Sequence, residues 1–267
     1  MNRDTLYSAG VFDLTESVTV TKPDTGDRYQ LMTAINQDHY VSVASTASGE
    51  FTLTQDEIGT RYGMVLFRTF FDPTDPDDVE AAQNVQDEIG ASQESTGTFE
   101  IPNWDQQSLE RIRDALITVG ETMDDTRDTY GEADGVDPIK HLLGTAIAWG
   151  GMPESETLFL FRTPEQNDGD APHTLTIEDV PVDGFWSVSV YNSDRYFEEN
   201  EYDAYSINNL TAERDDDGSV TIHFGGDSDQ SNFLYTPEGW TYTVRLYGPS
   251  EAILDGSYRF PEAQPIE

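Results

Sequence analysis

The spacing of apolar residues changes twice along this chain, and that change limits the folds it can adopt. Apolar and polar residues alternate from Ser17 to Thr21, and the pattern recurs in the first hundred residues. Alternation of this kind predicts short strands with one buried face. It returns after Thr157. The predicted strands are residues 17–21, 29–35, 39–43, 51–53, 62–71, 158–161, 173–177, 185–191, 220–224 and 240–247.

The centre of the chain has helical spacing instead. From about Asp105, apolar residues recur every three or four positions (Leu109, Ile112, Leu116, Val119 and Met123), which predicts a helix with one apolar face. A second helix is predicted from an Asp137 cap and Pro138 in its first turn, ending at Gly150-Gly151. We expect it to bury Ile139, Leu142, Leu143, Ala146 and Ile147. A shorter helix is predicted around residues 79–89.

Strands, then helices, then strands predict a mainly β protein with two β-sandwich-like domains joined by a helical segment. The predicted boundaries are an N-terminal β domain at 1–100, a helical bridge at 101–152 and a C-terminal β-sandwich at 153–267. No internal repeat of fixed period is visible.

The charge of the chain constrains its environment and its partners. There are 52 Asp plus Glu against 14 Lys plus Arg, a formal net charge of -38, and the acidic residues are dispersed. Only Lys22 and Lys140 are lysines. Such a surface repels itself at low salt, and molar salt screens that repulsion. We therefore predict a cytoplasmic protein of a salt-accumulating halophile, of haloarchaeal type.

The same charge argues against several partners. Nucleic acid requires clustered basic residues, and anionic membrane surfaces would repel this chain. No apolar stretch approaches the roughly 20 residues of a membrane span. The chain has no cysteine, which excludes disulfides and thiolate chemistry. A homo-oligomer remains open.

Two sets of motifs resemble known families. Asn2-Arg3-Asp4-Thr5-Leu6-Tyr7-Ser8, with Phe12-Asp13-Leu14 and Asp27-Arg28-Tyr29, resembles the domain of unknown function 1254. The C-terminal part resembles the domain of unknown function 1214. Its matching motifs are Gly184-Phe185-Trp186-Ser187-Val188, Tyr205-Ser206-Ile207-Asn208, Asp217-Gly218-Ser219, Arg245-Leu246-Tyr247-Gly248-Pro249 and Leu254-Asp255-Gly256-Ser257. The resemblance implies paired β-sandwich-like domains joined by helices, and it implies no reaction.

Standard catalytic signatures are missing from the sequence, including the nucleophile elbow, the zinc-protease helix and Gly-rich phosphate loops. The four histidines are His39, His141, His173 and His223, and none lies at metal-ligand spacing from another. We predict no metal site and no cofactor. His141 is interpreted as structural, and Asp38-His39-Tyr40 as the start of a strand with a weak acid/base pairing.

The opening motif is the main candidate site. Asn2, Arg3, Asp4 and Tyr7 are polar types that hydrogen-bond in many directions. We predict that they line a ligand pocket at the domain junction, with Tyr205, Ser206 and Asn208 contributed by the second domain. The alternative is a buried polar network that ties the N-terminus to the C-terminal sheet, with Arg3–Asp4 or Arg245 as internal pairs.

Three functions remain open from the sequence. The first is a module that binds a small molecule or glycan at this pocket. The second is a hydrolase-type enzyme that uses Asp4 with Arg3, or His39, as acid/base elements. The third is a structural or assembly protein with no ligand, which predicts a large exposed apolar surface.

Overall fold

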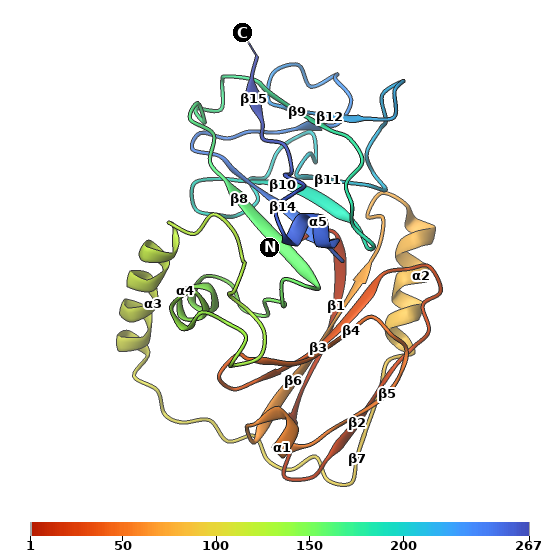
Figure 1. Ribbon diagram of the computed structural model, residues 1–267, viewed down its shortest axis with the longest axis vertical. Helices are drawn as coiled ribbons and strands as arrows, with labels where there is room; N and C mark the ends of the chain where they lie inside the picture. Colours follow the sequence, from red (N-terminus) through yellow and green to blue (C-terminus); the bar gives the residue numbers. More distant parts are fainter. Residues whose placement is uncertain (1, 267) are drawn as a thin grey trace. The chain divides into compact units, whose positions relative to one another are not determined.

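Two compact units make up the chain in a computed structural model that describes residues 2–266. Unit 1 contains residues 2–4 and 155–266, and unit 2 contains residues 5–154. Both units are built mainly from antiparallel strands with few helices (Figure 1), so the prediction of a mainly β protein with two β-rich domains is confirmed. The central helices belong with the N-terminal strands in unit 2, and residues 2–4 belong with the C-terminal strands in unit 1. The domain boundaries at 100 and 152 stay a prediction.

Unit 2 has a four-stranded sheet of order β1-β6-β3-β4 and a three-stranded sheet of order β5-β2-β7. One face of the larger sheet supplies Met32, Ala34, Val65 and Phe67 to a core shared with Val18 and Val20 of the smaller sheet. The strands are β1 (Thr5–Asp13), β2 (Val18–Lys22), β3 (Gln30–Asn36), β4 (Val41–Ser45), β5 (Gly49–Leu53), β6 (Tyr62–Phe70) and β7 (Gly90–Gln93).

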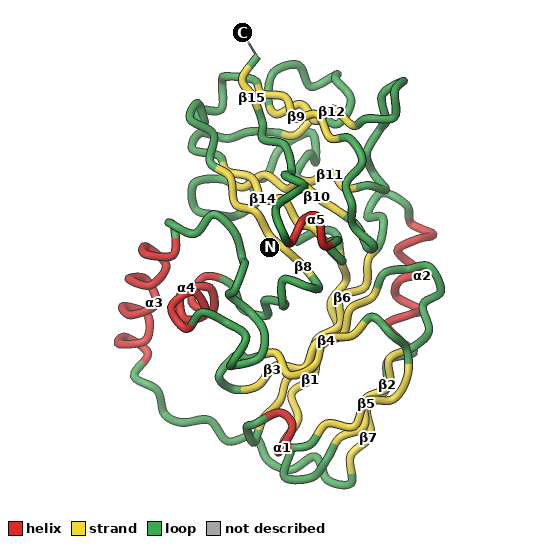
Figure 2. The backbone as a smooth tube through the Cα atoms, in the orientation of Figure 1, coloured by secondary structure: helices red, strands yellow, loops and turns green. Residues whose placement is uncertain are grey.

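Four helices accompany these strands: α1 (Gln55–Ile58), α2 (Pro76–Asp87), α3 (Gln106–Gly120) and α4 (Pro138–Ile147). The side chains of Asp105 and Asp137 accept hydrogen bonds from backbone N–H groups in the first turns of α3 and α4, as the capping rule predicts. Helices α3 and α4 lie side by side, and α2 contacts β1 and β6 (Figures 1 and 2).

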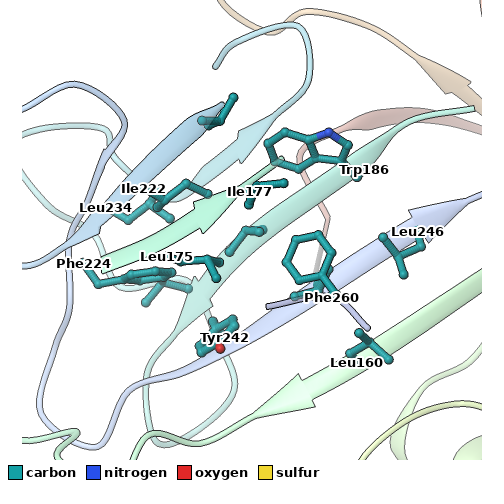
Figure 3. Close-up of a cluster of buried hydrophobic side chains, with 14 of the residues drawn as sticks. Leu160, Leu175, Ile177, Trp186, Ile222, Phe224, Leu234, Tyr242, Leu246 and Phe260 are labelled. Atoms are coloured by element: carbon teal, nitrogen blue, oxygen red, sulfur yellow. The ribbon is translucent and has the colours of Figure 1, made fainter. Parts of the chain in front are cut away.

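Unit 1 is a sandwich of two four-stranded sheets, of order β11-β10-β14-β8 and β13-β12-β9-β15. Figure 3 shows Trp186, Tyr242 and Leu246 of the first sheet in one cluster with Leu175 and Phe224 of the second. The elements are β8 (Thr157–Arg162), β9 (His173–Ile177), β10 (Trp186–Tyr191), β11 (Ser206–Asn208), β12 (Val220–Phe224), β13 (Phe233–Leu234), β14 (Thr241–Tyr247), α5 (Glu251–Leu254) and β15 (Gln264–Pro265).

The structure corrects the predicted burial of the second central helix, because Ile139 and Leu142 of α4 are exposed. Leu109, Ile112 and Val119 on the apolar face of α3 are exposed as well. Leu143 is buried as predicted. Amphipathic spacing identifies a face that can be covered, but it does not supply the covering element. No helix among residues 2–266 is long and apolar enough to cross a bilayer.

Near the N-terminus one strand was not predicted, and one prediction is wrong. The opening motif continues from Thr5 into β1, a nine-residue edge strand that the sequence pattern did not predict. His39 does not begin a strand, because it occupies a tight turn with a left-handed φ of 69°, and β4 begins at Val41.

Candidate functional site

One face of the β11-β10-β14-β8 sheet in unit 1 is polar although it is buried. Strand β10 alternates between Trp186, Val188 and Val190, which enter the core, and Ser187 and Ser189, which point to the opposite face. The register places Asn208 of β11, Ser187 of β10 and Arg245 of β14 opposite one another across this face. Because side chains alternate along each strand, one face of this sheet packs in the apolar core and the other carries a row of hydrogen-bonding side chains.

Asp4 lies on this polar face and accepts hydrogen bonds from three side chains. Ser187 Oγ donates to its Oδ2 at 2.8 Å, and Asn208 Nδ2 and Ser206 Oγ donate to Oδ1 at 3.2 and 3.4 Å. We call Asp4, Ser187, Ser206 and Asn208 the Asp4 network. Asp4 is 1% exposed and Asn208 is 2% exposed. Their positions match the internal-network alternative, and substrate could not reach the Asp4 carboxylate without a rearrangement.

Asn2 and Arg245 extend this network. Asn2 Oδ1 accepts from the Asp4 backbone N–H at 2.7 Å, and its Nδ2 donates to the Tyr247 hydroxyl at 3.1 Å. Arg245 is buried and donates to Ser189 Oγ at 2.9 Å and to the Tyr191 hydroxyl at 2.5 Å. Burial by itself lowers the pKa of Arg245, but its neighbours, among them Asp4, raise the pKa above the usual value. The Arg245 guanidinium therefore has hydrogen-bond acceptors in Ser189 and Tyr191 and a negative charge nearby in Asp4.

Arg3 and Tyr205 lie at the accessible edge of the same region. The Arg3 guanidinium carbon lies 4.5 Å from the centre of the Tyr205 ring, and Arg3 Nη1 pairs with Asp203 Oδ1 at 3.2 Å. The Arg3 side chain is 38% exposed. We call Arg3, Asp203 and Tyr205 the Arg3 edge. The ion-pair partner of Arg3 is thus Asp203 rather than Asp4.

Tyr205 also lines a shallow depression of about 170 Å³, a volume that includes open solvent. Its walls combine aromatic rings with an amide and a carboxylate, and the lining residues are Val190, Tyr191, Glu198, Asn200, Ala204, Tyr205, Tyr235 and Pro237. Aromatic walls with a few polar groups are typical of small-molecule sites. The depression is narrow, so a ligand would rest on it rather than enter it.

The remaining candidates lie in unit 2. Tyr7 is on β1 and is 47% exposed, with the Arg68 guanidinium carbon 5.5 Å from its ring centre. His39 and His141 are buried. His141 Nδ1 and Nε2 lie 2.9 and 3.1 Å from the carbonyl oxygens of Thr129 and Asp38, so the ring is enclosed by backbone, which fits its structural interpretation. Residues 2–266 contain no group of three His, Cys, Asp or Glu placed to hold a metal ion.

The hydrogen-bonding roles of Ser187, Ser189 and Tyr191 were not predicted from the sequence. A signal was available, because Arg245 stands alone in the otherwise uncharged strand Thr241–Tyr247. A buried guanidinium needs hydrogen-bond acceptors nearby. The alternating Ser187, Ser189 and Tyr191 on the neighbouring strand β10 include its two partners.

Comparison with known families agrees with this architecture. Residues 1–93 match the model of the family described as a protein of unknown function, DUF1254, and residues 162–251 match the model of a second family of unknown function, DUF1214. The resemblance seen in the sequence motifs is thereby confirmed for both families. Each match shows similarity to its family over the matched residues.

Solved structures support the same fold. The VPA0106 protein from Vibrio parahaemolyticus aligns with a TM-score of 0.77 and 19% identity, covering 100% of this chain and 90% of that one. An uncharacterised protein from Burkholderia cenocepacia aligns with a TM-score of 0.59 and 15% identity, covering 100% and 77%. Likeness at this level of identity shows the fold alone. Among curated proteins, no match to the chain is found.

Proposed function

We propose that unit 1 is a binding module for a small polar ligand of the glycan class, held at the Arg3 edge and the adjoining depression. The observation that carries the proposal is the half-exposed Arg3 guanidinium stacked on Tyr205, a ring that also lines the depression. Tyrosine rings offer a flat apolar face to the C–H side of a sugar. Glu198 accepts from Asn192 through Oε2, and its other carboxylate oxygen can accept from the sugar hydroxyls.

The Asp4 network supports this proposal because it positions Arg3; it does not itself contact the ligand. Asp4, Ser187 and Asn208 are buried and bonded to one another, so they fix residues 2–4 on the sheet. Arg3 follows Asn2 and precedes Asp4, and its backbone is therefore held on both sides. A rigid backbone lowers the entropy that Arg3 loses when a ligand binds.

A thermal-shift screen in molar KCl tests the proposal, with mono- and oligosaccharides as probes and short acids and nucleotides as comparisons. Ligands that bind the folded state raise the melting temperature by mass action. We expect a sugar to raise Tm in the wild type and to lose its effect in Tyr205→Ala. Tyr196→Ala is the matched control, because Tyr196 is an exposed tyrosine outside the depression. A sugar response that survives Tyr205→Ala contradicts the proposed site.

The proposed working environment is the cytoplasm of a salt-accumulating halophile, of haloarchaeal type. Its support is the net charge of -38 and the presence of only two lysines. Dilution from 2 M to 0.1 M KCl is expected to unfold or loosen the protein as charge screening falls. Circular dichroism measures this directly. An unchanged unfolding curve over that range would contradict the salt adaptation.

A second candidate function is self-association through helices α3 and α4. The supporting observation is a set of large apolar side chains exposed in unit 2: Phe99, Ile101, Trp104, Leu109, Ile112, Val119, Ile139, Leu142 and Trp149. Residues 138–152 contain no Asp or Glu, although 52 of the 267 residues are acidic. A second copy of so acidic a chain meets least repulsion at such a segment.

Sedimentation in molar KCl tests this second candidate. The wild type is expected to sediment as a dimer or larger species, and the double variant Ile139→Glu, Leu142→Glu as a monomer. Ile266→Glu provides a control at an exposed apolar residue of unit 1. A monomeric wild type at micromolar concentration contradicts self-association.

A further inference from the structure

Unit 2 contains a buried arginine that lacks a counter-charge. Arg68 lies on β6, between Tyr7 of β1 and Leu31 of β3 in the register, and it is 3% exposed. Its Nη2 donates to the Gly150 carbonyl, whereas its Nη1 is buried without a hydrogen-bond partner. No carboxylate among residues 2–266 forms an ion pair with it. In a chain with 52 acidic residues, this omission requires a physical explanation.

His39, which bonds the same Gly150 as Arg68, supplies a second unpartnered donor. The Gly150 backbone N–H donates to His39 Nε2 at 2.7 Å, so Nε2 carries no proton and Nδ1 carries it. Nδ1 is buried and has no partner. Burial, together with the nearby His141 and Arg68, lowers the pKa of His39 to about 4. At neutral pH the ring is therefore an uncharged N–H donor.

Gly150 bonds both side chains, but neither of its backbone groups bonds Arg68 Nη1 or His39 Nδ1. Its φ of 79° is left-handed, and an added Cβ would lie 3.3 Å from Arg68 Nη2 and 3.3 Å from Leu66 Cδ2. Glycine thus permits the close approach that lets its N–H reach His39 and its carbonyl reach Arg68. Both polar groups of Gly150 are used, and the donors on Arg68 Nη1 and His39 Nδ1 are left without an acceptor.

The other buried cation of unit 2 differs from Arg68 in its chemistry. Lys22 is 2% exposed, and burial lowers its pKa, so its charge can be lost by release of a proton. A guanidinium is a permanent cation in proteins. A buried permanent charge needs a partner of opposite sign.

We propose that Arg68, with the His39 Nδ1–H beside it, binds a monovalent anion inside unit 2. One guanidinium and one neutral imidazole carry a single positive charge, which one negative charge balances. A dianion such as sulfate would leave a buried negative charge unmatched. A halide and a small carboxylate both carry one negative charge and accept hydrogen bonds, as the site requires. This site is separate from the Arg3 edge and does not depend on the glycan proposal.

Melting curves of the full chain test the site, with the potassium concentration held constant and sulfate as the reference anion. At 100-fold excess over Kd, the Tm in chloride or acetate minus the Tm in sulfate is expected to be about 5–10 °C higher in the wild type than in Arg68→Met. Methionine keeps the apolar stem but not the charge, and the comparison between the two proteins cancels the general stabilisation by sulfate. Arg245→Met is the control: it should lower Tm and keep the anion difference. The arm that responds, chloride or acetate, identifies the class of anion.

A crystal grown in chloride-free salt and soaked in bromide gives an independent readout. An anomalous peak within 4 Å of Arg68 Nη1 supports the site, and its loss in Arg68→Lys, whose ammonium cannot reproduce the planar fork, shows that the guanidinium geometry matters. If neither bromide nor acetate occupies the position, or if the anion effect on Tm is equal in the wild type and in Arg68→Met, the proposal is overturned.

Discussion

Two buried arginines on central strands face opposite situations. Arg245 of β14 in unit 1 donates to Ser189 and Tyr191 and lies near the Asp4 carboxylate. Arg68 of β6 in unit 2 has one donor without a partner and no carboxylate. The difference teaches that burial of a charge does not by itself indicate a site. The hydrogen bonds and counter-charges around a buried cation distinguish one that stabilises the fold from one whose donors lack an acceptor.

The largest expected effect is at Asp4. Replacing it by alanine leaves the donors of Ser187 and Asn208 unmet and removes a negative charge near Arg245. We expect Asp4→Ala to lower the free energy of unfolding by about 3–5 kcal/mol. Denaturant titration in molar KCl measures it.

Asp4→Asn is the control, because it keeps an acceptor for Ser187 and loses only the charge, so its cost should be smaller. A loss below about 1 kcal/mol for Asp4→Ala would remove the basis of the comparison, since the Arg245 region would then not depend on its counter-charge.

An intermediate effect is expected from acid. The pKa of His39 is about 4 in the folded protein, below the ordinary value of 6.5. Between these values the unfolded chain binds more protons than the folded chain, so stability falls as pH falls. From pH 7 to pH 5 this one group should cost about 2 kcal/mol.

The measurement is the difference in unfolding free energy between the wild type and His39→Asn at each pH. Asparagine tolerates the left-handed backbone at this position, and the titration of the many carboxylates cancels in the difference. A difference that is constant from pH 7 to pH 5 would show that His39 is not buried as a neutral group.

The smallest effect on stability is expected at the Arg3 edge. Arg3 and Asp203 form an exposed ion pair, and such pairs contribute at most about 1 kcal/mol. The free energy of unfolding of Arg3→Ala should therefore lie within about 1 kcal/mol of the wild-type value, and the variant should lose the sugar response. If Arg3→Ala is as destabilising as Asp4→Ala, Arg3 belongs to the structural network and the ligand role fails.

Regular spacing allowed much of the fold to be predicted. Alternation located β9 at His173–Ile177 and β12 at Val220–Phe224, and the Asp137–Pro138 pair located the start of α4. Strand β1 escaped prediction because it is an edge strand held by backbone pairing to β6, and its residues Ser8, Ala9 and Gly10 carry no apolar alternation.

The candidate site was predicted less completely. The sequence associated Asp4 with Ser206 and Asn208, and the structure brings these side chains into hydrogen-bonding contact. Burial could not be predicted, because it depends on which face of the sheet is covered. Arg68 and Arg245 look alike in the sequence, each a lone charge in an uncharged strand. Only the partners, which come from distant segments, distinguish them.

The assignment of residues 2–4 to unit 1 has a consequence for biosynthesis. Asp4 leaves the ribosome before its partner Ser187, which is made 183 residues later. At about 5–20 residues per second this is a wait of roughly 10–40 s. Unit 2, whose residues 5–154 are contiguous, can fold during that interval, whereas unit 1 has to recruit residues 2–4 after its own strands are complete.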